Sequence, residues 1–427
     1  MHDQWIKRDV KRVWHGFTQM SVFEEMSPIV VQAAEGPYLI DVDDKKYLDA
    51  ISSLWVTTIG HNNNEINEAI SIQVNKVCHS TLLGNTNTAI IELSEALTEI
   101  VPVVDPHFLY ASDGAASVEQ ALKIAFQYWL NIGISQRSTF LTLTSGYHGD
   151  TIGSLSLGDS GFGTSIFDPL KFNTIRTPGY SSENWLYRAI LELEANYNSL
   201  AAVVIEPLVQ GASGMYTADP LQITELVKVA QDLGIIVIAD EVATGFGRTG
   251  SYFASDLCNI KPDIICLGKG LTAGYLPMSV TVVSNRIYEA FLGKDLSQKT
   301  FYHGHSFSGN PVCAAAAKKH IEILQRDKIV ESVPSKARFL KNELDRKIKK
   351  LTEVSEIRQI GLMVGVELKL KGEPGLAGRK VCAECVKRGV LMRPLGDVVV
   401  LMPHLNFTQE HISKMVSVLA QSISKVF

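Results

Sequence analysis

The sequence predicts an α/β fold, in which a large domain with a mostly parallel sheet is joined to a smaller α+β domain. Short, continuously apolar segments rich in β-branched residues alternate with segments of helical period over most of the chain. Strands that are apolar on both faces are typical of a parallel sheet covered by helices on each side. Beyond about residue 320 two long helical segments follow each other directly, which indicates a second domain.

In the large domain, strands and helices are expected to alternate along the chain. The expected strands are 107–111, 139–143, 201–207, 235–239 and 263–267, and the expected helices are 115–132 and 219–233. Because the strands are short and separated by helices, they are expected to lie parallel in one sheet.

The second domain is expected to mix long helices with a few strands. Its expected helices are 313–326, 333–350, 377–388 and 408–425, and its expected strands are 362–368 and 398–402. A hairpin-like stretch at 38–50 is expected to join this domain from the N-terminal end. The predicted division is therefore an N-terminal segment 1–58, a large domain 59–320 and a small domain 321–427.

Composition excludes several classes of partner. The net charge is −5 and the charged fraction is 20%, without the basic stripe that nucleic acid or an anionic membrane would require. The N-terminus shows no secretory signal, and no apolar run reaches the roughly 18 residues that span a bilayer, so a cytoplasmic protein is expected. The six cysteines are scattered, and Cys382 and Cys385 on an amphipathic helix are expected to be reduced structural thiols. His303 and His305 lack a third ligand nearby, so no metal site is expected.

A lysine between two glycines follows one of the predicted strands, in "DIICLGKGLTAGYLP" (263–277). The flanking glycines suggest a sharp bend of the backbone and a close approach to the amine of Lys269. Asp240 directly follows the strand 235–239, and ligands of open α/β sheets bind beyond the carboxyl ends of strands. The amine and the carboxylate are therefore expected to meet at one sheet edge, as a structural ion pair or as a site for pyridoxal 5′-phosphate (PLP). PLP needs an amine to react with its aldehyde and a carboxylate to keep its ring nitrogen protonated.

A phosphate seat and an aromatic ring surface would complete such a site. In "SDGAASVEQAL" (112–122), Ser112 to Gly114 lead from a strand into a helix near Ala115, where N–H groups and the helix dipole favour an anion. The same residues also fit an ordinary N-cap. Tyr147, in a glycine-rich loop after a strand, could cover the ring or belong to the core.

A rival interpretation is a nicotinamide-dependent oxidoreductase, because "GFGRTG" (245–250) matches G-x-G-x-x-G. The preceding strand ends five residues before the first glycine, and the following "SYFASDLCNI" has little helical amphipathicity. The pattern therefore favours PLP over a dinucleotide.

At "DEVATGFGRTG…DIICLGKGLTAGYLP" the sequence resembles the class III, fold-type I PLP-dependent aminotransferases, and the resemblance extends over almost the whole chain. It implies that Lys269 binds the cofactor covalently and that Asp240 faces the pyridinium nitrogen. It also implies that Val242 and Tyr147 cover the two ring faces. Gly114 and Ala115 would hold the phosphate, helped by His305 and Ser306 of a second subunit, since the family works as a homodimer with shared active sites.

Within that family, "WHGFTQM" (14–20), "SSLWVTTIGH" (52–61), "HSTLLGNTN" (79–87), "YHGHSFSGNPVCAAAA" (302–317) and "RPLGDVVVLMP" (393–403) resemble the diaminopelargonate synthase branch. That branch converts 7-keto-8-aminopelargonate (8-amino-7-oxononanoate) to 7,8-diaminopelargonate in biotin biosynthesis. The resemblance implies that Arg393 binds the carboxylate of the keto acid. It also implies that Trp55, Tyr147 and Gly304 line the substrate channel. The alternative is another ω-amino acid aminotransferase of class III.

Two substrate-binding positions depart from that branch. Phe17 and Leu54 occupy positions that resemble Tyr and Trp sites in the members that use S-adenosylmethionine as the amino donor. The changes remove a phenol and an indole ring. Since related enzymes use lysine, the donor is expected to be S-adenosylmethionine or lysine, with a slight preference for lysine.

Overall fold

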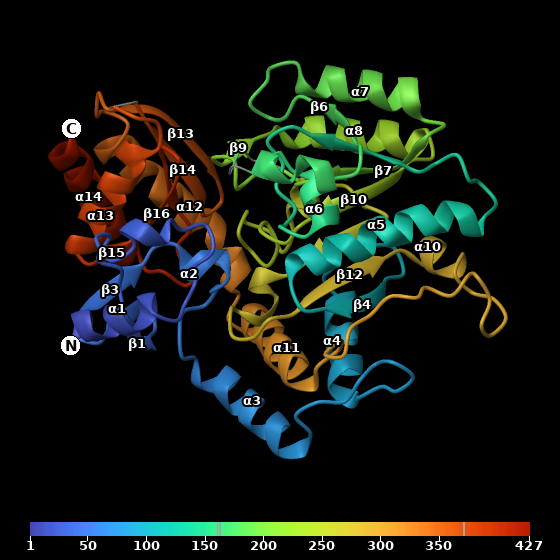
Figure 1. Cartoon of the computed structure of the whole chain (residues 1–427), viewed down its shortest axis with the longest axis horizontal. Coiled ribbons are helices and arrows are strands. Elements are labelled where there is room, and N and C mark those ends of the chain that lie inside the picture. The colour runs from blue at the N-terminus through green and yellow to red at the C-terminus, as the bar shows by residue number, and fades with distance from the viewer. Residues whose placement is uncertain (160, 162–163, 370–371) are drawn as a thin grey trace.

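The computed structural model describes residues 1–159, 161, 164–369 and 372–427. Its centre is a seven-stranded sheet with the order β4-β12-β11-β10-β7-β5-β6 (Figure 1). The bounds of these strands are β4 His107–Ala111, β5 Thr139–Leu143, β6 Ile175–Thr177, β7 Leu200–Ile205, β10 Ile236–Asp240, β11 Ile264–Leu267 and β12 Ser279–Val283. The predicted α/β class and the five predicted strands are confirmed, and β12, which runs antiparallel between β11 and β4, was not predicted.

Both faces of the sheet are buried, because alternate residues of one strand enter two different cores. Ala202 and Val204 of β7 pack with α5 (Gly114–Asn131), whereas Val203 and Ile205 pack with α7 (Trp185–Asn196) and α8 (Pro220–Asp232). Figure 1 shows α7 and α8 together on one side, with α5 crossing the sheet below them. This arrangement explains why the strands read as continuous apolar runs.

The C-terminal part is built on a second, antiparallel sheet of order β13-β14-β17-β16. Its strands are β13 Val354–Ile360, β14 Met363–Leu368, β17 Val398–Leu401 and β16 Arg393–Leu395, and its helices are α12 Ile329–Lys347, α13 Leu376–Lys387 and α14 Gln409–Val426. Cys382 and Cys385 are buried free thiols on α13, and burial raises the pKa of each.

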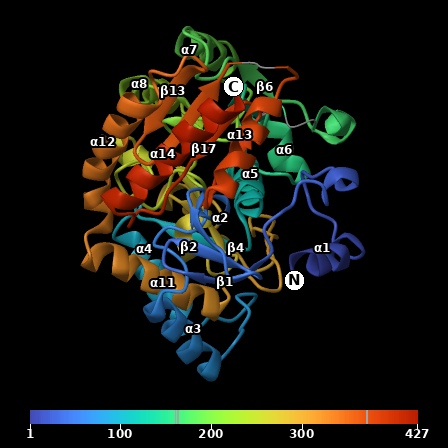
Figure 2. The ribbon, with the colours of Figure 1, turned by 90° about the vertical axis from the view of Figure 1, so that its left-hand side faces the viewer.

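The N-terminal strands lie beside this C-terminal part. The hairpin of β2 (Tyr38–Asp41) and β3 (Lys46–Asp49) is flanked by β1 (Val31–Glu35) and pairs through β3 with β15 (Val390–Leu391). Figures 1 and 2 both show these blue strands next to the red and orange elements of the C-terminal end. The divisions at 58/59 and 320/321 stay a prediction.

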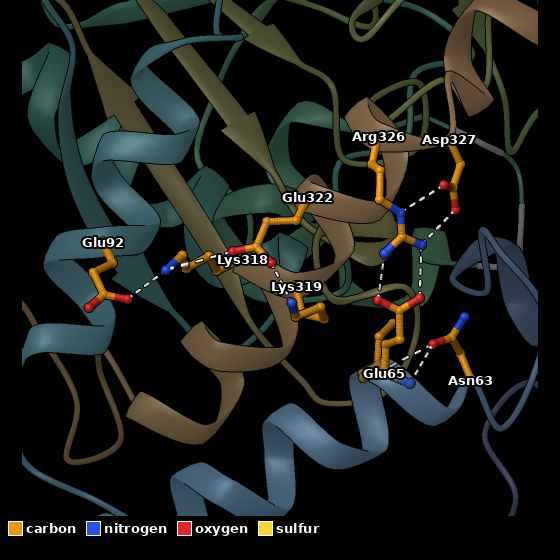
Figure 3. Close-up of polar contacts among 9 residues, drawn as sticks. Asn63, Glu65, Glu92, Lys318, Lys319, Glu322, Arg326 and Asp327 are labelled. Carbon is orange, nitrogen blue, oxygen red and sulfur yellow. Dashed lines mark hydrogen bonds and ion pairs between the residues drawn. The ribbon is translucent and has the colours of Figure 1, made fainter.

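Three helices form a lower layer in Figure 1: α3 (Asn64–Lys76), α4 (Thr88–Thr98) and α11 (Pro311–Arg326). Figure 3 shows that Arg326 of α11 donates hydrogen bonds to both carboxylate oxygens of Glu65 of α3, at 2.7 and 2.8 Å. Lys318 donates one to Glu92 of α4 at 2.7 Å. Exposed pairs of this kind add little stability, so the buried Ile66, Leu93 and their apolar neighbours hold the layer together.

The remaining elements are short. They are α1 His2–Val10, η1 Met20–Val22, α2 Ser52–Trp55, α6 Ile152–Leu157, η2 Thr164–Leu170, β8 Val209–Gln210, β9 Tyr216–Thr217, α9 Ala254–Leu257, η3 Lys269–Thr272 and α10 Asn285–Glu289. Among the helices of the described residues, none is both long and apolar enough to cross a bilayer.

Candidate active site

Lys269 begins the single-turn helix η3, two residues after β11 ends. The backbone bends at Lys269 itself, which has a positive φ of 39°, while the backbone of Gly268 is extended. Gly270 is needed for space, because an added Cβ would lie 3.0 Å from Thr58 Cγ2. The expectation that the flanking glycines supply the bend is therefore wrong for Gly268, whose backbone any residue can adopt. A non-glycine residue at positive φ is uncommon and often marks a functional site.

Asp240 is the last residue of β10, and its carboxylate is buried and doubly hydrogen-bonded. Oδ2 accepts a hydrogen bond from His148 Nδ1 at 2.7 Å, and Oδ1 accepts one from the Val242 N–H at 3.0 Å. Because β10 and β11 are parallel neighbours, with Asp240 opposite Cys266, Asp240 and Lys269 both follow the same sheet edge. The predicted meeting of carboxylate and amine at one edge agrees with this register.

His148 gives Asp240 a cationic partner. Burial opposes charge on the imidazole, but the hydrogen bond and the negative charge of Asp240, together with Glu206, raise the pKa of His148. A carboxylate is the partner that a protonated pyridine nitrogen requires.

The amine of Lys269 lies among aromatic and charged groups. Its Nζ is 4.9 Å from the centre of the Trp55 ring. Burial lowers the pKa of Lys269, although the negative charges of Asp240 and Glu206 oppose that effect. A lowered pKa increases the fraction of neutral amine, which is the form that attacks an aldehyde.

Glu206, which sequence reasoning missed, lies in the same region. It follows β7, and its carboxylate accepts hydrogen bonds from the N–H groups of Tyr147 at 3.0 Å and Gly211 at 3.2 Å. Burial raises the pKa of Glu206 to about 7, although the charge of His148 opposes the shift. The available signal was the one that identified Asp240, an acidic residue directly after an apolar strand.

The start of α5 lies against the lysine turn. Asp113 caps the helix by accepting a hydrogen bond from the Ala116 N–H at 3.0 Å. The first N–H groups of a helix have no partner inside it, which leaves those of Gly114 and Ala115 for an anion. A Cβ added at Gly114 would lie 2.6 Å from Val242 Cγ1. A Cβ added at Gly268 would lie 3.6 Å from Gly114 Cα. The predicted phosphate seat, Val242 and the lysine turn are therefore adjacent.

Tyr147 lies in the loop after β5, next to His148. Its hydroxyl donates a hydrogen bond to Asp150 Oδ2 at 2.9 Å, and burial raises its pKa. The Tyr147 N–H bond to Glu206 ties this loop to the end of β7. Tyr147 thus stands beside the site, and its stacking on a ring stays a prediction.

Trp55, which is predicted to line the substrate channel, lies beside Lys269. Its side chain is 7% exposed, and an added Cβ at Gly211 would lie 3.2 Å from the indole ring. The neighbouring Leu54 and the more distant Phe17 are 48% and 63% exposed. Arg393 is exposed on β16 and makes no ion pair within the described part of the chain. The roles of these residues toward substrate stay predictions.

The segment with Gly304, His305 and Ser306 is not joined to the lysine turn by any hydrogen bond or ion pair between described residues of one chain. Gly304 and Ser306 are exposed, and the Ser306 carbonyl accepts a hydrogen bond from His79 Nε2 at 2.7 Å. His305 Nε2 is buried and has no partner among the described residues. Their contribution to a second subunit's site stays a prediction.

The segment "GFGRTG" does not form a nucleotide-binding loop. Phe246 and Arg248 are buried within it, and Arg248 donates hydrogen bonds to the carbonyls of Thr57 at 2.9 Å and Pro403 at 2.6 Å. The next helix, Ala254–Leu257, is a single turn. A dinucleotide fingerprint needs a strand, a tight turn and a full helix, so the nicotinamide interpretation is wrong.

A family model described as "Aminotransferase class-III" matches residues 19–423. The chain therefore belongs to the class-III aminotransferases and is a PLP-dependent enzyme. It is 39% identical to the adenosylmethionine-8-amino-7-oxononanoate aminotransferase of Anoxybacillus flavithermus, covering 99% of this chain and 96% of that protein. The protein of the same name from Geobacter sulfurreducens is 38% identical, covering 98% and 97%.

Solved structures agree with this assignment. The chain matches the crystal structure of adenosylmethionine-8-amino-7-oxononanoate aminotransferase from Methanocaldococcus jannaschii with a TM-score of 0.96 and 38% identity, over 99% of both chains. It also matches the ω-transaminase of Pseudomonas jessenii in complex with PMP, with a TM-score of 0.93 and 25% identity, over 98% of this chain and 97% of that one. The predicted fold type I and the predicted class III family are confirmed.

Proposed function

We propose that this enzyme transfers an amino group to 8-amino-7-oxononanoate and forms 7,8-diaminopelargonate, a step of biotin biosynthesis. The observation that carries the proposal is the position of Lys269, which stands beyond one sheet edge together with the hydrogen-bonded pair of Asp240 and His148. Relatives named for this substrate are 33–39% identical over almost the whole chain, which supports the choice of acceptor.

The residues present fit PLP. Burial leaves the indole N–H of Trp55 without a partner among the described residues, and a Cβ at Gly114 would fill the space in front of Val242. Buried polar atoms without hydrogen-bond partners, and space left open by a glycine, are features of a site that binds another group. When bound, PLP supplies an aldehyde that carries the amino group and a ring that delocalises electrons from the substrate carbon.

The side chains then have distinct tasks. Lys269 would hold the cofactor, and its Nζ, when free, would move a proton at the donor's reacting carbon. Asp240, which is hydrogen-bonded to His148, would hold the proton on the ring nitrogen. Gly114 and Ala115 would bind the phosphate through their N–H groups, and Val242 and Tyr147 would enclose the ring. Because the donor product leaves before the keto acid enters, the kinetics are ping-pong.

Substrate recognition is assigned to exposed residues together with the buried Trp55. Arg393 is exposed and unpaired within the described residues, so its guanidinium is available for the carboxylate of the keto acid. Trp55 and Gly304, together with Tyr147, line the channel. In the homodimer that we propose, His305 and Ser306 of one chain reach the phosphate bound by the other, which would give the unpaired His305 Nε2 a partner.

The amino donor in this proposal is S-adenosylmethionine, as the names of the relatives print for those proteins. Lysine is a second candidate, and the observation that favours it is the exposed apolar pair Phe17 and Leu54. An apolar pair offers neither the hydroxyl nor the indole ring that would bind a sulfonium or an adenine.

The test is an assay with 8-amino-7-oxononanoate and each donor, run side by side. We expect product with one donor, loss of turnover in Lys269→Ala, and normal turnover in Lys228→Ala, which removes an exposed lysine of α8. Borohydride should fix the cofactor's mass on Lys269. Absence of product with both donors would overturn the acceptor assignment, whereas substantial turnover by Lys269→Ala would overturn the role of the lysine.

A further inference from the structure

A buried carboxylate ends the N-terminal strand β3, which pairs with β15 of the C-terminal part of the chain. Asp49 ends β3 and is fully buried. Its Oδ1 accepts a hydrogen bond from the Ile51 N–H at 3.2 Å, and its Oδ2 accepts one from the Ser53 N–H at 2.7 Å. A carboxylate that accepts two backbone N–H groups fixes the turn that follows it.

Two histidines from distant parts of the chain contact the same oxygen. His61 Nε2 lies 2.9 Å and His404 Nε2 lies 3.4 Å from Asp49 Oδ2. The two imidazole rings are 5.2 Å apart in an edge-to-face arrangement. Burial would raise the pKa of Asp49, but the hydrogen bonds and charges of His404 and His61 hold it far below its ordinary range. Asp49 is therefore an anion at every physiological pH.

These three ligand atoms lie within 4.8 Å of one another, which is also the pattern of a metal site. Hydrogen bonding explains the cluster better. A metal on His404 Nε2 would require the proton on Nδ1, which is buried and has no partner among the described residues. Metal-bound histidines normally donate that second N–H to an acceptor. Because an ionised carboxylate only accepts, each histidine instead donates its Nε2–H to Asp49 Oδ2, the oxygen that also accepts the Ser53 N–H.

The turn that Asp49 fixes is strained. Ser52, Ser53 and Trp55 have φ of 55°, 61° and 65°, a conformation that non-glycine residues rarely adopt. Such conformations persist only where the surroundings impose them. Here the restraints are Asp49, acting on the N–H groups of Ile51 and Ser53, and the Ser52 hydroxyl, which donates to the Met402 carbonyl at 2.6 Å.

The strained turn ends at Trp55, whose ring lies 4.9 Å from Lys269 Nζ. We propose that Asp49, held by His61 and His404, is a positioning residue of the active site that keeps the 51–55 turn in the conformation placing Trp55 beside Lys269. This role deepens the proposed function and rests on it, because it matters for catalysis only if Lys269 holds the cofactor.

The test compares Asp49→Asn and His404→Phe with the control Glu343→Gln, which changes a buried carboxylate of α12 that is bonded to Lys347 and Arg346. His404→Phe keeps an aromatic ring and remains informative if Asp49→Asn does not fold. In the loaded enzyme, amide hydrogen exchange of residues 50–57 is measured together with kcat, KM and the pH titration of the cofactor absorbance.

We expect faster exchange at residues 50–57 in both variants and a fall in kcat of about 10- to 100-fold in Asp49→Asn, because a displacement of about 1 Å near the chemistry has that effect. The absorbance midpoint should move to higher pH, since water would replace indole beside a cationic nitrogen. The charged neighbours of Lys269, which are Asp240, Glu206 and Arg248, stay unchanged in these variants. Glu343→Gln should alter none of the three measurements.

Unchanged exchange at 50–57, or a fall in thermal stability with normal kcat and a normal absorbance titration, would show a merely structural role and overturn the inference. One tightly held zinc ion per chain, lost in His404→Phe, would also overturn it. If the wild-type enzyme showed no cofactor absorbance, the proposed function would fail, while the exchange measurement would still report on Asp49.

Discussion

His148 Nδ1 and Asp240 Oδ2 lie 2.7 Å apart, and both side chains are buried. His148 belongs to the loop after β5 and Asp240 ends β10, with β7 between the two strands. The pair therefore connects two loops that the sheet brings to the same edge. The hydrogen bond and the negative charge of Asp240 raise the pKa of His148, which favours a charged pair.

Replacing His148 by Leu should destabilise the enzyme by about 3 kcal/mol or more, because it leaves a buried carboxylate without its cation. His148→Asn, which can still donate to Asp240, should recover part of the loss. The raised pKa makes this stabilisation complete below the ordinary value of 6.5 and lost as pH rises through the folded value. Urea denaturation from pH 6 to 9 measures the difference, and a gap between wild type and His148→Asn that widens with pH would contradict the ion pair.

A second buried histidine should dominate acid sensitivity near the lysine turn. His320 of α11 accepts a hydrogen bond from the Thr58 hydroxyl at 2.7 Å and donates one to the Leu271 carbonyl of η3 at 3.2 Å. Burial lowers the pKa of His320 to about 4, so the neutral ring is the folded form.

Because this pKa is depressed, the folded state binds fewer protons than the unfolded state between pH 6.5 and 4, and stability falls as pH falls. The difference between the ordinary pKa of 6.5 and the folded value of about 4 corresponds to about 3 kcal/mol of folding stability. His320→Gln can make the same two hydrogen bonds without titrating, so we expect it to lose less stability over this range. Denaturation curves at pH 7 and pH 4.5 measure the effect, and equal acid losses in both proteins would refute it.

Gly114→Ala should weaken cofactor binding by about tenfold or more, because the new Cβ would overlap Val242 Cγ1 at 2.6 Å. Gly16→Ala is the control, since a Cβ there meets nothing within 4 Å. Titration of each cofactor-free protein with PLP gives the two affinities. Normal affinity in Gly114→Ala would mean that the phosphate is bound elsewhere.

Arg393→Ala should raise the KM for the keto acid by about 10- to 100-fold, the effect of losing a hydrogen bond to a charged group. The half-reaction with the amino donor should keep its rate, because Arg393 is proposed to bind only the keto acid. Arg393→Lys should fall between the two, since an ammonium cannot form the forked pair. Single-turnover measurements of each half-reaction separate these effects, and an equal loss in both would assign Arg393 to the donor or to the fold.

Local patterns predicted much of the fold, and the reason is visible in individual elements. Strand 107–111 is found with the same bounds, and the predicted 201–207 ends at Ile205, shortly before Pro207, which has no N–H for a ladder. Strand β12, in "SVTVV", was not predicted, and its antiparallel direction is decided only by its pairing with β11 and β4. Helix α11 begins earlier than predicted, at Pro311, where Asn310 caps it through the Val312 and Cys313 N–H groups.

The sequence by itself determined the chemistry at the sheet edge, because Lys269 and Asp240 each follow an apolar strand and parallel strands end at one edge. Only the tertiary structure decided which groups surround them. His148 reaches Asp240 past the intervening strand β7, Glu206 reaches Tyr147 from a neighbouring strand, and His404 meets Asp49 across 355 positions of the chain. Such contacts depend on how elements pack, and no local pattern records which buried side chain a distant segment will bring to a given carboxylate.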